Sequence, residues 1–416
     1  MKIKQTILIT AALLFSLHLS YSQWVPQSPG TNESMSGIAC FTSLPVILLT
    51  GSQSIYKSTN NGTNWTNISY PAPTFAVQDV IISGTTTAWA CGNGRILKST
   101  NAGSNWVAAT VPNRYWNSGY FLNDNTGWFC GGTDTVIKTT NGGTNWTIQE
   151  NNLYQGENNY GIVFTNSLLG LMVGSYDTPN AGYILKTING GGTWLTVFTS
   201  NSYIHSITMV NSQTGYAGGT GKIYKTTNSG SNWSETSISG AGALYTVCFP
   251  LDTLVGYAAG LLGKMYKTTN AGNNWYPLTT GVTGNFKGMD FNFGSSTTGY
   301  AVGTTGVVLR TTNGGGAFVE VAGNNTSVPE NYALHQNYPN PFNPVTQISF
   351  SIPKSEHVKI TIYNTLGMET AVLLDEAKDA GTHSVSLDAS GYPSGVYFYT
   401  ITSGSFTATK KMILLK

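Results

Sequence analysis

Charged residues and cysteines are scarce in this chain of 416 residues. Asp, Glu, Lys and Arg together make up only 9% of it, and the formal net charge is +2. Such a chain lacks the basic surface that nucleic-acid binding requires, so we predict no nucleic-acid partner. Four cysteines are also too few for a small fold held together by disulfides.

Long apolar runs are rare as well. The one at the start, from Ile7 to Leu19, follows Lys2 and Lys4 and precedes the small residues Ser20 and Ser22. This order is typical of a secretory signal peptide, and the run is too short for a stable membrane span. We therefore expect residues 1–22 to be a signal peptide and the mature chain to have no transmembrane segment.

What the chain does have is a nine-residue motif that recurs seven times between Lys57 and Phe318. Each copy has a basic residue, two residues that are mostly Ser or Thr, Asn, a spacer, Gly, two spacers and an aromatic, as in KSTNNGTNW. The Asn residues are Asn60, Asn101, Asn141, Asn189, Asn228, Asn270 and Asn313, and the aromatics are Trp65, Trp106, Trp146, Trp194, Trp233, Trp275 and Phe318. A period of about 40 residues indicates a stacked or circular repeat.

Local chemistry predicts four short antiparallel strands per repeat. The apolar run Gly215–Gly219 and the alternating stretch Lys222–Thr226 are typical of strands joined by a loop. In the motif, we expect the Asn side chain to accept hydrogen bonds from amides two residues on and the Gly to adopt a positive φ, which predicts a tight hairpin. Seven such units predict a seven-bladed β-propeller over residues 23–322.

The closing aromatic of each motif begins a strand and is expected to pack on the neighbouring unit. Trp24 begins a similar strand in residues 23–27, far from the other repeats. We predict that this segment completes the seventh blade and closes the ring, competing with or extending a strand at residues 318–321.

The motif resembles the Asp-box, or BNR repeat, of sialidases and related propellers, with Asn in place of the usual Asp. The run from Thr298 to Gly314 resembles the propeller family of the photosystem II assembly and stability factors. In such propellers this hairpin lies opposite the usual binding mouth, so we interpret the repeated Asn and aromatic residues as fold-making. The arginine-rich patch of the photosystem family is absent, which disfavours that role.

The period stops near Val328, and a different set of strands follows. Alternation over Gln347–Ile352 and Val358–Asn364, and a further strand at Val396–Thr402, predict a small Ig-like β-sandwich. We place it at residues 332–416, after a linker at 323–331. The whole chain is thus expected to be all-β.

This tail resembles the type A C-terminal sorting domain of the type IX secretion system of Bacteroidota. The resemblance rests on NYPNPFNP, IYNTLG, GYPSGVYFY and the ending KKMILLK. It implies export through the periplasm, recognition by the outer-membrane translocon and a secreted or cell-surface location. The matching sorting residues are Gly395, Lys410, Lys411 and Lys416. The alternative is an Ig-like domain that serves only as a binding or spacer domain.

Catalytic constellations are weak in this sequence. Sialidase chemistry needs three converging arginines. The chain has only Arg95, Arg114 and Arg310, and two of them lie on expected third strands beside the repeated turn, so the triad is missing. A glycosidase needs two carboxylates, and these could come from Asp79 and Asp290 beside the central channel. Further carboxylates lie on loops, at Asp134, Glu150, Glu157 and Asp177. No metal-ligand spacing or cofactor motif is present, so we predict neither a metal site nor a cofactor.

Cys91 and Cys130 occupy equivalent positions in consecutive repeats. We expect them to pack as small hydrophobic residues, with a disulfide between them as the alternative.

The loops of the expected binding mouth mix aromatic residues with amides, which suits neutral sugars or peptides. Its candidate ligand-binding residues are Arg114, Tyr115, Trp116, Tyr160, Tyr176, Asp177, Tyr203 and His205. The sequence therefore favours a secreted or cell-surface binding module without catalysis, whose ligand is a glycan or a protein. The alternative is a secreted carbohydrate-active hydrolase that uses the loop carboxylates.

Overall fold

The computed structural model describes residues 23–71, 73–132, 135–150, 158–176, 181–250, 254–292, 295, 297–316, 331–337 and 340–415. The chain divides into two compact units, Met1–Val319 and Glu320–Lys416. The expected signal peptide at 1–22 and nearly all of the expected linker at 323–331 lie outside the described residues. So do the candidate residues Asp177, Phe318 and Lys416.

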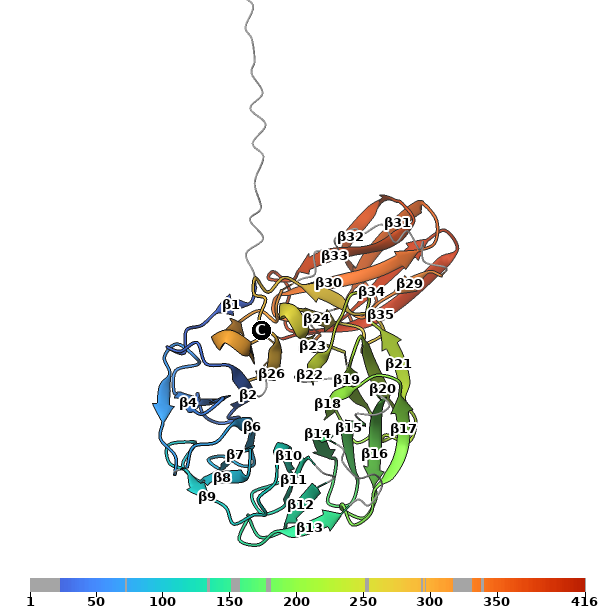
Figure 1. The fold of residues 1–416 in the computed structure, drawn as a ribbon. Coiled ribbons are helices and arrows are strands. Elements are labelled where there is room, and N and C mark those ends of the chain that lie inside the picture. Colours follow the sequence, from blue (N-terminus) through green and yellow to red (C-terminus); the bar gives the residue numbers. More distant parts are fainter. Residues whose placement is uncertain are drawn as a thin grey trace, which may run out of the picture. The chain divides into compact units, whose positions relative to one another are not determined.

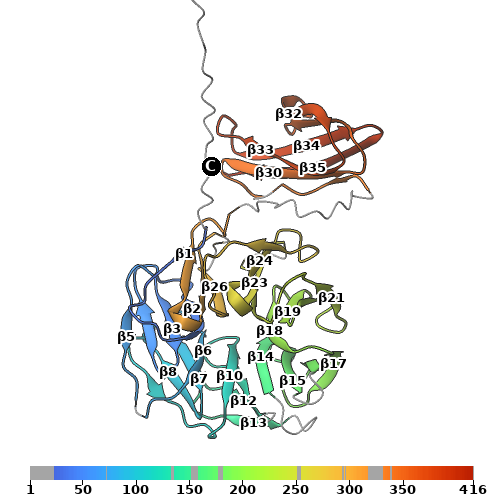
Figure 2. The same ribbon diagram turned by 45° about the horizontal axis from the view of Figure 1, so that its top comes forward.

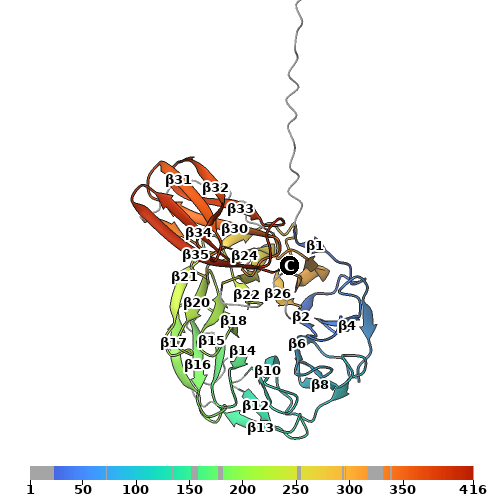
Figure 3. The ribbon, with the colours of Figure 1, turned by 180° about the vertical axis from the view of Figure 1, so that it is seen from behind.

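The first unit consists of seven four-stranded antiparallel sheets, here called blades 1 to 7 in chain order. Figure 1 shows them arranged in a ring, with the first strand of each blade nearest the axis. Seen from behind in Figure 3, the later strands of the blades form the outer rim. The predicted seven-bladed β-propeller is confirmed.

The strands have the following bounds. Blade 1 contains β2 (Met35–Cys40), β3 (Ile47–Gly51), β4 (Ile55–Ser58) and β5 (Thr66–Ile68). Blade 2 contains β6 (Val77–Ile82), β7 (Ala88–Gly92), β8 (Arg95–Ser99) and β9 (Val107–Ala108). Blade 3 contains β10 (Trp116–Phe121), β11 (Gly127–Gly131), β12 (Thr135–Thr139) and β13 (Thr147–Glu150). Blade 4 contains β14 (Asn158–Phe164), β15 (Gly170–Tyr176), β16 (Ala181–Thr187) and β17 (Leu195–Ser200).

Blade 5 contains β18 (Ile204–Met209), β19 (Gly215–Gly219), β20 (Lys222–Thr226) and β21 (Ser234–Ser237). Blade 6 contains β22 (Leu244–Cys248), β23 (Gly256–Gly260), β24 (Met265–Thr268) and β25 (Tyr276–Leu278). Blade 7 contains β26 (Phe286–Phe291), β27 (Gly299–Gly303), β28 (Val308–Thr311) and β1 (Val25–Pro26). Among the described residues, two single 3-10 turns are η1 (Leu261–Gly263) and η2 (Thr304–Gly306). Predicted strands Gly215–Gly219 and Lys222–Thr226 match β19 and β20.

Blade 7 is completed by the N-terminal segment, as predicted. In the antiparallel pairing of β1 with β28, Val25 lies opposite Arg310 and Pro26 opposite Leu309. Trp24 is fully buried and packs edge-on against Tyr257 and Phe291, with ring centroids 6.2 and 6.1 Å away. The first described residues therefore join the two ends of the ring. Residues 318–321, the expected competing strand, lie outside the described part.

The nine-residue motif forms the hairpin between the third and fourth strands, but its hydrogen bonds differ from our expectation. Asn60 Oδ1 accepts from the amide of Asn64, four residues on, at 2.9 Å. The hydroxyl of Ser58 accepts from the amide of Gly62 at 2.9 Å and donates to Asn60 Oδ1. The bond from the motif Asn Oδ1 to the amide four residues on is present in blades 1 to 6. The small polar residue and the Asn together hold the turn.

Each motif turn docks on the preceding blade. In the preceding blade, the second residue of the second strand bonds to the motif turn. The Trp128 indole of blade 3 donates to the Gly190 carbonyl of blade 4 at 3.0 Å, and the Tyr257 hydroxyl of blade 6 donates to the Gly314 carbonyl of blade 7 at 2.9 Å. The basic residue of the preceding motif adds a second link, as in Lys98, whose ammonium donates to the Gly142 carbonyl at 2.7 Å. The repeated lysines therefore form hydrogen bonds between neighbouring blades.

The second unit is a two-sheet sandwich, which agrees with the predicted Ig-like domain. One sheet has the order β29 (Ala333–Leu334), β30 (Val345–Ile352) and β33 (Gly381–Asp388). The other has the order β32 (Glu369–Lys378), β31 (Glu356–Tyr363), β34 (Gly395–Ser403) and β35 (Phe406–Leu414). Figure 2 shows both sheets, with β30 and β33 beside β34 and β35.

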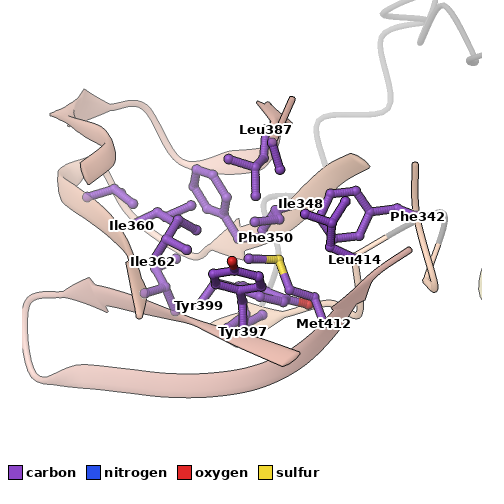
Figure 4. Packing of buried hydrophobic residues seen from close by; sticks show 14 of the residues in the cluster. Phe342, Ile348, Phe350, Ile360, Ile362, Leu387, Tyr397, Tyr399, Met412 and Leu414 are labelled. Atoms are coloured by element: carbon purple, nitrogen blue, oxygen red, sulfur yellow. The ribbon is translucent and has the colours of Figure 1, made fainter. Parts of the chain in front are cut away.

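Side chains from both sheets meet in one hydrophobic core. Figure 4 shows Phe350 and Leu387 of the first sheet facing Ile360 and Tyr399 of the second. The NYPNPFNP segment is tied to the last strand, because the amide of Phe342 donates to the Ile413 carbonyl at 2.9 Å.

Candidate functional site

The first strand of every blade carries a β-bulge at the same position, near the strand's beginning. In β18, Ile204 pairs with Gly219 and Ser206 with Gly218, so His205 is an extra residue without a partner in the ladder. The same irregularity recurs in all seven first strands. The extra residues, here called the bulge residues, are Ser36, Gln78, Asn117, Tyr160, His205, Tyr245 and Lys287. Bulges redirect side chains and are frequent beside functional sites.

A glycine in the second strand makes room for each bulge. A Cβ on Gly92 would come within 1.9 Å of the Ala76 carbonyl oxygen, and one on Gly131 within 1.7 Å of that of Tyr115. The residue paired at the bulge is glycine in every blade: Gly51, Gly92, Gly131, Gly174, Gly219, Gly260 and Gly303. These glycines were visible in the sequence and could have located the bulge residues.

Four consecutive bulge residues, on blades 4 to 7, form a row of neighbouring side chains whose rings are tilted against one another. The ring centroids of Tyr160 and His205 are 5.6 Å apart, and those of His205 and Tyr245 are 5.0 Å apart. The ammonium of Lys287 lies 3.7 Å from the centroid of the Tyr245 ring, a cation–π geometry. The other three bulge residues, on blades 1 to 3, are a hydroxyl and two amides.

Burial controls the charge of this row. It lowers the pKa of His205 to about 4, with a smaller contribution from the positive charge of Lys287. His205 is therefore neutral at pH 7, and its Nε2 is buried without a hydrogen-bond partner among the described residues. Burial also lowers the pKa of Lys287. Its ammonium makes no ion pair with a carboxylate in the described part of the chain.

The predicted mouth residues lie in different environments. Tyr160 and His205 belong to the row, and Tyr203 lies beside it, with its ring 6.0 Å from that of His205. Arg114 and Tyr115 are exposed, and Tyr115 forms a single bridge to Asn93 of blade 2.

Two of the predicted mouth residues pack into the molecule. Trp116 is fully buried in a core cluster with Trp89 and Phe129, so it contributes to packing and is not available to a ligand. Tyr176 packs against Tyr183, with ring centroids 4.8 Å apart. Sequence reasoning missed Tyr245 and Lys287, because it did not use the second-strand glycines to locate the bulges.

Asp79 and Asp290 lie on first strands, as expected, but each links two blades. Asp290 accepts from the amide of Cys40 in blade 1 at 2.7 Å, and Asp79 from the hydroxyl of Ser118 in blade 3 at 2.9 Å. Burial raises the pKa of each carboxyl to about 6. These bonds are structural, and they occupy oxygens that general acid–base catalysis would need. The four loop carboxylates have no described side chain.

At the opposite ends of the first strands lies a cavity of about 360 Å³. Its lining includes Cys40, Cys248, Phe249, Met289 and Asp290. All four cysteines of the chain are free thiols, which excludes the alternative of a disulfide between Cys91 and Cys130. Burial raises the pKa of Cys40 and Cys248, so both are protonated and unreactive at neutral pH. Within the described residues, no cluster of His, Cys, Asp or Glu is arranged to hold a metal.

In the second unit, two residues of the NYPNPFNP segment anchor it. The Asn337 amide nitrogen donates to Thr346 Oγ1 at 2.9 Å, and its backbone amide donates to the Tyr399 hydroxyl at 2.6 Å. Asn340 Oδ1 accepts from the amide of Ile413 in β35 at 2.8 Å. Gly395 opens β34, and Lys410 and Lys411 lie in β35, where Lys411 is exposed.

Comparison with known proteins defines both units. Residues 336–415 match the family described as the secretion system C-terminal sorting domain. Such a domain is handled by the type IX secretion machinery, so the protein is secreted or located at the cell surface. No helix among the described residues is both long and apolar enough to cross a membrane.

The propeller is similar to several solved structures. YCF48 from Cyanidioschyzon merolae is 18% identical, with a TM-score of 0.56 over 69% of this chain and 98% of that one. A structure described as YCF48 bound to D1 peptide is 17% identical, with a TM-score of 0.58 over 71% and 98%. The GH74 xyloglucanase from Xanthomonas campestris is 13% identical, with a TM-score of 0.57 over 70% and 54%.

At these identities the likeness shows the fold alone. No curated protein sequence matches the chain. The molecule is thus an exported β-propeller with a C-terminal sorting domain.

Proposed function

We propose that this protein is a non-catalytic binding module that holds a glycan or a protein segment at the bulge residues of its propeller. The observation that carries the proposal is the row Tyr160, His205, Tyr245 and Lys287. Seven bulges at one position redirect a side chain from every blade, and four neighbouring ones are aromatic or cationic. Stacking on aromatic rings combined with amide hydrogen bonds is a common way to hold sugars and peptides.

Two further observations support binding over catalysis. The carboxyls of Asp79 and Asp290 already hold blades together, and His205 is neutral with a pKa near 4, far below the range of an efficient general base at pH 7. The related fold of YCF48 has been described with a bound D1 peptide, so a peptide ligand is compatible with this architecture.

The test uses the purified chain from residue 23 onward on glycan and peptide arrays. We expect a ligand whose binding is lost in the double variant Tyr160→Ala, Tyr245→Ala. The matched control is Tyr363→Phe in the sorting domain, which should bind like the unchanged protein. Turnover of chromogenic glycosides that is lost on replacing Glu157 or Asp177 would instead support a hydrolase and contradict the proposal.

A further inference from the structure

The ammonium of Lys287 is a partly buried cation without a negative partner in the described part of the chain. Several other propeller lysines have polar partners: Lys98 and Lys225 bond to carbonyls of the next blade, and Lys57 and Lys186 to hydroxyls of the next blade. Lys222 forms an ion pair with Glu235 at 2.9 Å. Lys287 instead lies over Tyr245 at 3.7 Å. Leaving a desolvated charge unpaired costs free energy, which an anion bound beside it would recover.

The two described carboxyls of the first strands do not neutralise Lys287. Asp290 is three residues further along β26 and accepts from the amides of Cys40 and Phe291 at 2.7 and 2.8 Å. Asp79 accepts from Ser118 and from the amide of Val80. Both carboxyls are therefore held by neutral donors, and neither forms an ion pair with Lys287 in the described part of the chain. His205 is neutral, so the row presents one positive charge at the end of a series of aromatic rings.

The bulges also decide how a ligand can be held. A bulge interrupts the regular sequence of backbone donors and acceptors near the beginning of the first strand, so an extended peptide cannot pair with the strand there as an added β-strand. Recognition depends on side chains: rings for stacking, and the amides of Gln78 and Asn117 for hydroxyl groups. Asn117 uses one amide hydrogen for the Asn159 carbonyl at 2.8 Å, which fixes its orientation and leaves its oxygen as an acceptor.

We infer that the ligand is an acidic glycan, a chain of sugars that carries a uronate carboxylate beside Lys287. The sugar rings would lie along Tyr160, His205 and Tyr245, and hydroxyl groups would meet the amides of blades 2 and 3. This inference rests on the proposed function and narrows it to one chemical class.

The experiment compares each acid with its own neutral form. Short oligogalacturonates and alginate oligomers are titrated calorimetrically into the purified chain from residue 23 onward, alongside the same oligomers with their carboxyls reduced to alcohols. We expect at least one acid to bind about tenfold more tightly than its reduced form, the effect of one charged contact. The preference should weaken as salt is raised.

The variant Lys287→Gln should bind the acid and its reduced form equally, because only the charge contact is lost. Lys359→Gln in the sorting domain makes the same charge change and should keep the preference. A wild-type protein that binds both forms equally, or a Lys287→Gln variant that still prefers the acid, overturns the inference. Binding only of peptides with a free terminal carboxylate also overturns it, while leaving the proposed function in place. The proposed function itself fails if no bound ligand is lost in the Tyr160→Ala, Tyr245→Ala variant.

Discussion

The hydroxyl of Tyr300, in blade 7, donates a hydrogen bond at 3.0 Å to the carbonyl of Asn61, in the motif of blade 1. The residues are 239 positions apart in the chain. Tyr216 and Tyr257 make the same bond to the motifs of blades 6 and 7, at 3.0 and 2.9 Å. The seam of the ring, where blade 7 meets blade 1, thus uses the same tyrosine-to-carbonyl hydrogen bond that joins other neighbouring blades.

Removing this hydroxyl should weaken the seam. We expect Tyr300→Phe to lower the free energy of unfolding by about 1 kcal/mol, the usual net worth of one hydrogen bond. All ten tryptophans lie between residues 24 and 275, so fluorescence during urea unfolding reports on the propeller alone. Tyr115→Phe removes the hydroxyl of an exposed tyrosine and serves as the control. A Tyr300→Phe midpoint equal to that of the control would contradict the prediction.

The N-terminal strand should stabilise the propeller more than its two paired residues suggest. Trp24 is fully buried against Tyr257 and Phe291, so Trp24→Ala should cost about 3–5 kcal/mol of stability. Deleting residues 23–28 should lower the melting temperature by several degrees. Val25→Ala, at an exposed position of the same strand, should change it little. An unchanged melting temperature in the deleted protein would show that ring closure does not use this strand.

Asp79 should make stability depend on pH. Burial raises its pKa from 3.8 to about 6, so the folded protein binds more protons than the unfolded chain between these values. Stability from this group is therefore greatest below about pH 4 and is lost as the pH rises to 6. In Asp79→Asn, the amide can still accept from Val80 and donate to Ser118, and the loss disappears.

The expected result is a variant about as stable as the wild type at pH 4 and roughly 2–3 kcal/mol more stable at pH 7, since one unit of pKa shift corresponds to about 1.4 kcal/mol. Thermal unfolding at a series of pH values measures the difference. If Asp79→Asn follows the wild-type pH dependence, the carboxyl is not desolvated.

Two neighbouring residues of one motif should both favour glycine, so that opposite substitutions shift the stability in opposite directions. Ala271 has a φ of 58°, which is strained for a residue with a Cβ, so Ala271→Gly should stabilise the propeller by roughly 0.5–1 kcal/mol. Gly272 has a φ of 76°, and a Cβ there would lie 2.9 Å from the Tyr216 ring. Gly272→Ala should destabilise by more than that amount. Urea midpoints of the two variants decide the matter, and a shift of the same sign in both would contradict the strain argument.

Much of the fold could be predicted because its signals are local and repeated. The Asn and Gly of each motif specify a hairpin wherever they occur, and the period fixed the number of blades. Trp24 was recognised as a closing strand because it precedes a short strand-like segment, as the motif tryptophans do. The sorting domain was recognised by several motifs in a fixed order.

The candidate site was harder to predict, because its residues share no local pattern. His205 and Lys287 lie 82 positions apart and are linked only through Tyr245 and the circular arrangement of blades. Trp116 looked like an exposed aromatic next to Tyr115, yet a change of one position along the strand places it in the core. The Gly at the end of each second strand marked the bulge, but its meaning depends on a carbonyl from a different strand.

The seven bulge residues carry one further consequence. Glycines and strand pairing hold the bulge in place whatever side chain it presents, and the motif contacts that join the blades lie elsewhere on each blade. Two of the seven, Ser36 and Asn117, also donate to carbonyls of the next blade, those of Val77 and Asn159. On the proposed function, a mutation at one of the other five positions would alter what the ring selects without removing such a bond between blades. Over evolution, such a scaffold can acquire new preferences one amino acid at a time.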